Sequence, residues 1–149
     1  MNFTVDGRDY HVVLDRKTNA DAKYHCTHEV FRGRHGKLFE PKDQSSYFEV
    51  IRHVERIAGN EGRRMWMGIE RNPESFSQEG RYQFRYMTDA EPLVNGIANW
   101  GRHQPDNYQD SEDCVEYWTS KAWKPDAQLR KQWNDVNCLY ERTAICEAV

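Results

Sequence analysis

The 149-residue sequence predicts an α+β domain. Two helical patterns lie in the N-terminal part, short strand patterns follow them, and a long segment between residues 91 and 113 has little periodicity. Helices followed by a run of strands are typical of α+β architecture, whereas α/β folds alternate the two. The length suits one domain of ordinary size, so we expect residues 1–149 to form a single domain.

The N-terminal part predicts a strand and then a helix. Residues 3–14 alternate loosely between polar and apolar side chains, which indicates a strand pair or an edge strand. Thr18 and Asn19 can cap a helix over about residues 20–31, which the glycines after it would end. The residues expected on one face of this helix are Ala20, Tyr24, His28 and Phe31.

A second helix has the clearer pattern. Ser46 and Glu49 have the spacing of a capping box, and Gly59 with Asn60 can stop the helix. Apolar residues between them follow the spacing of one buried face. These residues are Tyr47, Val50, Ile51, Val54, Ile57 and Ala58.

The remaining sequence predicts short strands around a long loop. Residues 65–69 are continuously apolar, as in a central strand, and residues 82–86 alternate cleanly. The segment 91–113 is rich in Pro, Gly, Asn and Asp, and a loop of this length in a small domain is usually functional or disordered. Further strands are expected at residues 115–118, near residues 132–133 and at residues 143–146.

Composition and charge exclude several classes of protein. The formal net charge is -3, which argues against a nucleic-acid partner. No apolar run approaches membrane-spanning length, so we expect no membrane insertion. Residues 1–6 lack the basic and apolar regions of a signal peptide, so either an export signal has been removed or the domain comes from a larger protein.

The four cysteines indicate an oxidising environment. Cys26, Cys114, Cys138 and Cys146 form no Cys-x-x-Cys motif, and four cysteines allow three pairings. We interpret them as two disulfides and expect an extracellular location, either secreted or on the cell surface. Four buried, reduced thiols in a cytosolic protein are the alternative.

Oxygen-bearing side chains gather in two segments of the sequence. The first segment supplies Gln104, Asp106 and Glu112, and the second supplies Asn134 and Asp135. Calcium binds six to eight oxygens in a flexible shell, so this set suggests a calcium site with open positions for a ligand. Proline after Gln104 can fix the first two donors in a tight turn that allows a cis peptide bond.

Motifs in most of the chain together resemble the C-type lectin-like domain. Any one of them alone is weak, but their shared order and spacing make the resemblance specific. The motifs are Trp66-Met67-Gly68-Ile69, Gln104-Pro105-Asp106, Glu112-Asp113-Cys114-Val115, Trp133-Asn134-Asp135 followed by Cys138, and Ile145-Cys146-Glu147.

This resemblance implies the C-type lectin-like fold, two disulfides and a calcium-dependent sugar site. The implied disulfides join Cys26 to Cys146 and Cys114 to Cys138. The implied calcium ligands are Gln104, Asp106, Glu112, Asn134 and Asp135. Two neighbouring sugar hydroxyls would complete the coordination shell.

The same resemblance implies which sugar binds. Family members with Gln-Pro-Asp resemble binders of galactose or N-acetylgalactosamine, whereas Glu-Pro-Asn resembles mannose binders. Tyr108 is the first candidate for an aromatic ring against the apolar face of the sugar, and packing within the loop is its alternative role. His103 precedes the motif and could touch the ligand. The implied sugar-binding residues are Gln104, Asp106, Tyr108, Glu112 and Asn134.

Two departures from the family pattern affect the expected site. Some relatives bind a second calcium, but Asn107 stands where they have an acid, and Glu70 and Glu74 do not align convincingly upstream. We therefore doubt a complete second site, although Asp113 remains available. The spacing from Cys114 to Trp133 is also longer than usual, and the extra residues include Trp118, Trp123, Lys124 and Arg130.

Two other classes of function remain to be weighed. The long spacing after Cys114 somewhat favours a protein-recognition module in which calcium only orders the loops. An enzyme using Glu112 and Asp113 is disfavoured, because neighbouring carboxylates in an extended segment point to opposite faces. For a lectin we expect weak binding of monosaccharides, with avidity from homo-oligomers or neighbouring domains.

Overall fold

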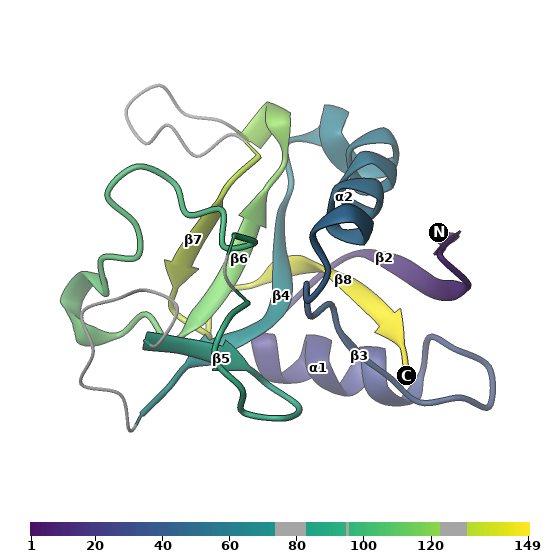
Figure 1. The fold of residues 1–149 in the computed structure, drawn as a ribbon, viewed down its shortest axis with the longest axis horizontal. Coiled ribbons are helices and arrows are strands. Elements are labelled where there is room, and N and C mark those ends of the chain that lie inside the picture. The colour runs from purple at the N-terminus through teal and green to yellow at the C-terminus, as the bar shows by residue number, and fades with distance from the viewer. Residues whose placement is uncertain (74–82, 95, 123–130) are drawn as a thin grey trace.

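The computed structural model describes residues 1–73, 83–94, 96–122 and 131–149 (Figure 1). Three single-turn 3₁₀ helices, at Gly59–Glu61, Tyr108–Asp110 and Ser120–Ala122, accompany the main elements. In chain order the main elements are β1 (Asn2–Val5), β2 (Arg8–Lys17), α1 (Asn19–His28), β3 (Gly36–Leu38), α2 (Gln44–Ala58), β4 (Arg64–Arg71), β5 (Phe84–Tyr86), β6 (Cys114–Trp118), β7 (Trp133–Val136) and β8 (Arg142–Ala148).

The strands form one sheet in the order β1-β2-β8-β4-β6-β7, with β3 paired to β8 and β5 paired to β4. The pair β4–β8 is parallel and the other pairs are antiparallel. The predicted α+β class is confirmed. The parallel pair arises because β8 returns from the far end of the chain into the middle of the sheet, beside β4.

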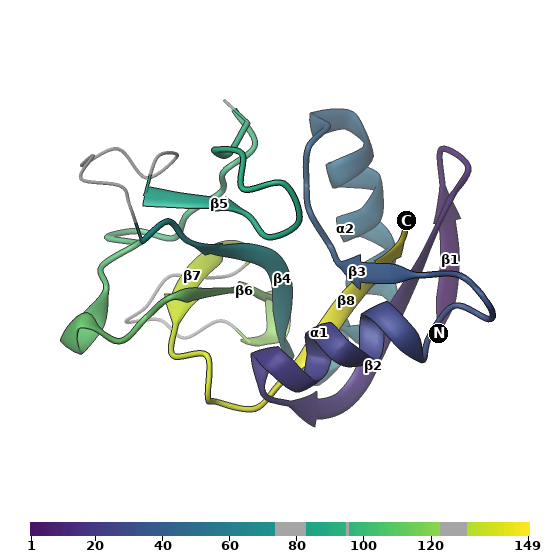
Figure 2. The ribbon, with the colours of Figure 1, turned by 90° about the horizontal axis from the view of Figure 1, so that it is seen from below.

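The two helices pack on opposite faces of this sheet, and β8 runs between them in both views (Figures 1 and 2). Alternate residues of a strand point to opposite faces. Met65 and Met67 accordingly join the core cluster that contains α2, whereas Trp66 joins the cluster that contains α1. The sheet therefore has a hydrophobic core on each side.

Helix α1 differs from its prediction in the face that it buries. Thr18 caps it as expected, because its Oγ1 accepts a hydrogen bond from Asp21 N. The buried residues are Asn19, Ala22 and Cys26, while Tyr24 is 60% exposed. The polar sequence gives no strong apolar face, and the disulfide of Cys26 turns its side of the helix towards the sheet.

Helix α2 buries the predicted face but starts earlier. Tyr47, Val50, Val54 and Ala58 are buried, and Ile51 and Ile57 pack against the same core. The predicted capping box is wrong. Asp43 is the cap, and its carboxylate accepts the hydrogen bond from Ser46 N at 2.9 Å.

Two disulfides connect distant parts of the chain, as the resemblance implied. Cys26 and Cys146 lie 5.3 Å apart at their Cα atoms and join α1 to β8. Cys114 and Cys138 lie 5.2 Å apart and join the start of β6 to the segment after β7. The second bridge therefore holds together the two segments that carry the predicted calcium ligands.

The long loop lies at the end of the molecule opposite to both termini (Figures 1 and 2). Its residues 96–100 continue the core through buried Ile97 and half-buried Trp100, whose ring packs edge-on to Trp133 at 5.7 Å between centroids. Gly101 N then donates to Trp133 O at 2.9 Å. These contacts place residues 104–112 beside β7.

Candidate metal and ligand-binding site

Asp135 connects the loop to the sheet. It stands on β7, and its side chain is fully buried. Its Oδ1 accepts a hydrogen bond from Asp106 N at 3.1 Å, and its Oδ2 accepts one from Asn107 N at 2.7 Å. The turn after the cis Gln104–Pro105 bond is therefore fixed by one carboxylate.

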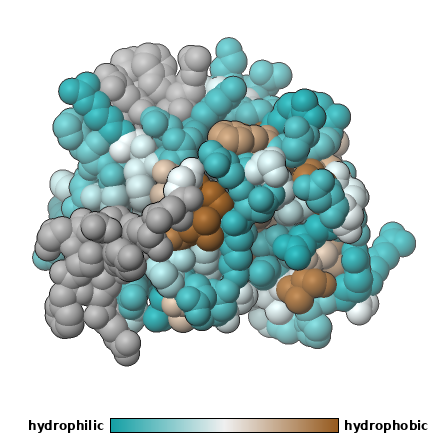
Figure 3. All heavy atoms as spheres, in the orientation of Figure 1, coloured by the Kyte–Doolittle hydropathy of each residue, from teal (hydrophilic) through white to brown (hydrophobic). Residues whose placement is uncertain are grey.

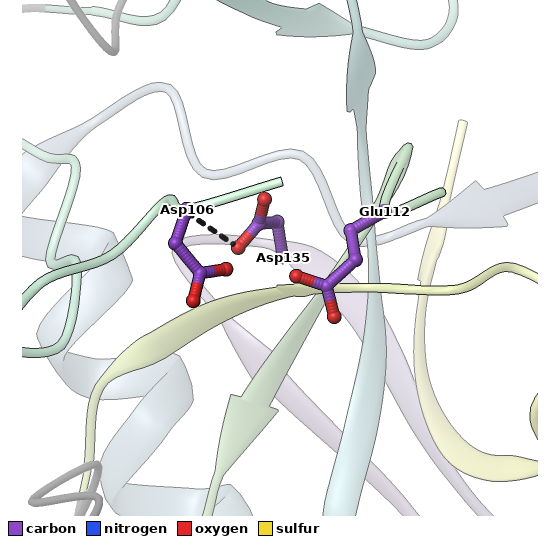
Figure 4. Close-up of side chains that lie close together, drawn as sticks. All are labelled: Asp106, Glu112 and Asp135. Carbon is purple, nitrogen blue, oxygen red and sulfur yellow. Dashed lines mark hydrogen bonds between the residues drawn. The ribbon is translucent and has the colours of Figure 1, made fainter. Parts of the chain in front are cut away.

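Glu112 closes the same loop from its other end. Its Oε1 accepts a hydrogen bond from Tyr108 N at 2.9 Å, and its own backbone N–H donates to Asn107 Oδ1 at 3.2 Å. The carboxylates of Asp106, Glu112 and Asp135 point towards one another (Figure 4). Each provides an oxygen, and these three oxygens lie within 4.8 Å of one another.

Gln104 points its amide into this cluster. One terminal atom of the amide lies 2.9 Å from both Asp135 Oδ1 and Asn134 Oδ1, and 3.2 Å from Asp106 Oδ1. Rotation of the amide exchanges its oxygen and nitrogen at this position. With nitrogen there, the two N–H groups of Gln104 donate to these oxygens without a metal. With oxygen there, four oxygens meet at one point, and a cation between them would offset their repulsion.

The donor set fits calcium. Calcium–oxygen distances are about 2.3–2.6 Å, so two oxygens on one ion can be at most about 5 Å apart. The three carboxylate oxygens meet this limit, and the Gln104 and Asn134 amides lie against them. The structure thus brings all five predicted ligands together from the loop and from β7.

The electrostatics of the cluster also favour a cation. Burial, together with the nearby carboxylates of Asp106 and Asp135, raises the pKa of Glu112 to about 8. Burial likewise raises the pKa of Asp135, although hydrogen bonds from Asn107 and Asp106 and the positive charge of Arg71 oppose this. Negative charge is therefore costly at this position unless a positive charge compensates it.

Glu116 holds Asn134 and was not foreseen. This fully buried carboxylate lies on β6 opposite Asn134, and its Oε2 accepts from Asn134 Nδ2 at 3.0 Å. It also accepts from Trp118 Nε1 at 2.7 Å and from Arg142 Nε at 2.6 Å. Glu116 thereby directs the Asn134 carbonyl towards Gln104. An acid within an apolar strand was the available signal, because an acidic residue is almost never fully buried without a partner.

Arg71 is a second residue that the sequence did not indicate. From the end of β4, its Nη2 donates to Asp135 Oδ2 at 3.0 Å and to the Glu112 carbonyl at 2.9 Å. Its Nε also pairs with Asp113 Oδ1 at 3.2 Å. The guanidinium thus connects the segment that carries Glu112 to strand β7, which carries Asp135. Its partners are 41 to 64 positions away in sequence, so no local pattern could reveal it.

Tyr108 and His103 are exposed beside the cluster. Tyr108 is 64% exposed and begins the short 3₁₀ turn Tyr108–Asp110. Its ring is therefore free for a ligand to contact and does not pack within the loop core. His103 has a left-handed backbone conformation with φ 66° and an exposed side chain.

Other acidic candidates are engaged elsewhere. Glu70 accepts from Arg85 Nε at 2.8 Å, and Asp113 contacts Arg71 whereas Glu112 faces the cluster. The adjacent acids thus serve different partners, as the strand argument predicted. Glu74 lies outside the described residues, as do Trp123, Lys124 and Arg130 of the long spacing after Cys114.

A comparison with protein families gives a direct match. Residues 15–148 match the family described as "Lectin C-type domain". The chain therefore belongs to the C-type lectin domain family, as its motifs indicated. Within the described residues, no helix is long and apolar enough to span a membrane.

Curated relatives are lectins of greater length. Lectin subunit alpha from Sarcophaga peregrina is 26% identical over 151 residues, which cover 99% of this chain and 47% of that protein. Hepatic lectin from Gallus gallus is 33% identical over 84 residues, which cover 56% of this chain and 32% of that protein. The chain thus spans less than half the length of these relatives.

Solved structures show the same fold. The C-type lectin CEL-I from Cucumaria echinata aligns with a TM-score of 0.74 at 17% identity, covering 99% of this chain and 94% of that chain. A Ca2+-dependent type II antifreeze protein aligns with a TM-score of 0.69 at 18% identity, covering 99% and 97%. Because the fold includes an antifreeze protein, the ligand must be argued from this chain's own site.

Proposed function

We propose that this domain binds terminal galactose or N-acetylgalactosamine in a calcium-dependent manner. The observation that carries the proposal is the convergence of the Gln104 amide on Asp106, Asn134 and Asp135 at 2.9 to 3.2 Å. Bound calcium would supply the positive charge that holds these oxygens together and would leave coordination positions for sugar hydroxyls. Membership of a lectin family supports carbohydrate as the class of ligand.

The five side chains can bind hydroxyls because they include both amides and carboxylates. A sugar hydroxyl can donate its hydrogen to a carboxylate and accept one from an amide. Asn134 has a second amide hydrogen available, since Glu116 accepts only one. With Gln104 as the amide and Asp106 as the acid, the donor and acceptor directions match those of galactose-type sites in the family.

Tyr108 supports the same choice of sugar. Its exposed ring lies two residues after Asp106, on the loop that the cluster holds in place. Galactose presents an apolar face of C–H groups, against which an aromatic ring can pack. We therefore assign Tyr108 as the sugar platform, with Gln104, Asp106, Glu112 and Asn134 as the hydroxyl-binding residues.

Retention on galactose-agarose tests this proposal. Protein loaded with calcium should be retained, and either EDTA or free galactose should elute it. Retention that persists in EDTA would contradict the calcium-dependent site. A domain that melts at higher temperature with calcium but binds no glycan would instead be a protein-recognition module with calcium-ordered loops.

The setting of the proposed activity follows from the disulfides. Cys26–Cys146 and Cys114–Cys138 suit an oxidising compartment, so we propose a secreted or cell-surface location. A shallow site for one sugar gives weak binding, and avidity would come from homo-oligomers or from neighbouring domains. We propose no catalytic activity, because the acids of the site hold the loop and face a metal position.

A further inference from the structure

A polar cavity separate from the calcium cluster lies where β2, β8 and β4 run side by side in the sheet. Its volume is about 320 Å³. Positively charged side chains predominate in it, because four of its eight residues are arginines. The residues lining it are Arg16, Glu61, Gly62, Arg63, Arg64, Glu141, Arg142 and Thr143.

Two of the four arginines already have carboxylate partners. Arg142 donates to the buried Glu116 at 2.6 Å, and Glu116 is also used by Trp118 and Asn134. Arg63 pairs with Glu61, with Nε 2.8 Å from Oε2. Glu61 and Glu116 therefore have little capacity left for the other guanidinium groups, and the other acid of the lining is Glu141.

Arg16 and Arg64 are the two without an ion pair in the part of the chain that the structure describes. The Arg64 guanidinium is held over the Trp118 ring, with its central carbon 4.2 Å from the ring centroid. This contact fixes the position of the charge at little entropic cost. Arg16, by contrast, is an exposed residue of the lining.

The arginines repel one another in this cavity. Burial lowers the pKa of Arg64, and the positive charges of Arg142 and Arg16 lower it further, against the opposing effect of Glu116. Guanidinium nevertheless stays charged at any physiological pH. The four guanidinium groups outnumber the carboxylates of Glu61, Glu116 and Glu141, so the cavity keeps an excess of positive charge that an anion would relieve.

We propose that this cavity binds a tetrahedral oxyanion, namely the sulfate or phosphate group of a small molecule or of a glycan. Guanidinium groups match such oxygens in pairs of parallel N–H···O bonds, and these charge-assisted bonds are strong. Arg64 and Arg16 provide donors from two sides, on β4 and β2. The site uses none of the five proposed calcium ligands, so its binding does not require calcium.

Calorimetric titration in EDTA tests the site apart from the calcium cluster. The probes are inorganic sulfate, inorganic phosphate, glucose 6-sulfate and glucose 6-phosphate, with neutral glucose as the control and ionic strength held constant. The charged probes should bind saturably and glucose should not. Equal affinity for ions and esters would identify a free anion as the ligand, and tighter binding of esters would identify the esterified molecule. No saturable binding by any charged probe would overturn the proposal.

Substitutions at Arg16 test whether the anion binds in this cavity. Because Arg16 is exposed and unpaired among the described residues, its replacement should leave the fold intact. Arg16→Gln should weaken binding about tenfold, since a hydrogen bond to a charged group is lost, and Arg16→Glu should abolish it. Arg52→Gln removes an equally positive but distant residue of α2 and should change nothing. If Arg16→Glu and Arg52→Gln bind the charged probes with equal affinity, the anion site does not lie in this cavity. The anion site is independent of the proposed sugar site, so a failure of the domain to bind galactose would leave this proposal standing.

Discussion

At the scale of single residues, the site depends on side chains that do more than one task. Asp135 accepts two backbone N–H groups of the loop and also faces the Gln104 amide. A carboxylate can do this because its two oxygens carry about four acceptor positions. The loop conformation and the proposed metal position are therefore coupled through one buried group.

Glu116→Gln should weaken calcium binding without removing a calcium ligand. The substitution loses the charge that holds Asn134 Nδ2 and Arg142, so the Asn134 carbonyl is less well oriented. We expect the calcium dissociation constant to rise by about tenfold or more, as for other groups that orient metal ligands. Isothermal titration with calcium measures it.

Glu147→Gln is the matched control for Glu116. Glu147 is equally buried and pairs with Arg8 at 3.1 Å, away from the calcium cluster. Loss of the Glu147 charge should lower the free energy of unfolding and leave the calcium affinity unchanged. If both variants lose calcium affinity equally, Glu116 acts only through general stability.

Exchanging the acid and the amide of the first motif should change the preferred sugar. The double variant Gln104→Glu with Asp106→Asn keeps five oxygen donors but reverses which position donates a hydrogen bond. We expect calcium affinity to persist and galactose affinity to fall about tenfold relative to mannose, since each misdirected charged hydrogen bond is costly. Competition of each free sugar for an immobilised glycan measures this ratio. Asp110→Asn, a nearby exposed acid, should leave the ratio unchanged.

At the scale of elements, the sequence predicted strongly periodic segments best. The apolar face of α2 follows from side-chain spacing, and the central strand β4 from a short continuous apolar run. The face of α1 could not be predicted, because its few apolar residues give no periodic pattern and Cys26 sets the orientation. The cap Asp43 was missed because Ser46 offered an equally good local signal.

The same limit applies to the candidate site. Its five donors stand in two recognisable motifs, so residue type and order were enough to find them. Glu116 has a local signal, as an acid within an apolar strand, but its partner Asn134 and the role of Arg71 depend on which strands become neighbours. Pairing between residues far apart in sequence is a property of the folded sheet and leaves no local pattern.

His11 on β2 should make the fold sensitive to acid. Burial, together with the charges of the N-terminal amino group and His25, lowers the pKa of His11 to about 4. The unfolded chain has the ordinary value of 6.5 and takes up a proton first as the pH falls. The stabilising contribution is therefore complete above pH 6.5 and is lost progressively towards pH 4.

Thermal unfolding at neutral pH and near pH 5, in EDTA, tests this sensitivity. Gln at position 11 cannot take up the proton. The melting temperature of His11→Gln should therefore fall less between the two conditions than that of the unmodified protein. His35→Gln changes an exposed histidine and should keep the full loss. An equal loss in all three proteins would contradict the assignment to His11.

The disulfide Cys114–Cys138 should support both the fold and the calcium site. Its removal in a double serine variant opens a loop with a sequence separation of 24 residues. The chain-entropy estimate is a loss of about 3 kcal/mol in unfolding free energy. Because the bridge joins the segments that carry Glu112 and Asp135, calcium affinity should also fall. Denaturant unfolding and calcium titration of the folded fraction measure the two effects, and unchanged calcium affinity would show that the bridge serves stability alone.

At the scale of the whole molecule, the hydrophobic core lies apart from the end that carries the proposed binding site. Two disulfides and two hydrophobic clusters fix the sheet, and the calcium cluster lies on the loops opposite to the termini (Figures 1 and 2). The face in Figure 3 is mostly hydrophilic, with small and separate hydrophobic areas among the coloured residues. This surface suits a polar ligand such as a glycan better than an extensive apolar contact.

The central claim is that one calcium-dependent site prefers galactose to mannose. Calorimetric titration with galactose, N-acetylgalactosamine and mannose, each in calcium and in EDTA, tests it most directly. The account predicts weak, millimolar binding of the first two sugars in calcium, much weaker binding of mannose, and no binding of any sugar in EDTA. Preference for mannose, or galactose binding that is unchanged in EDTA, would contradict it.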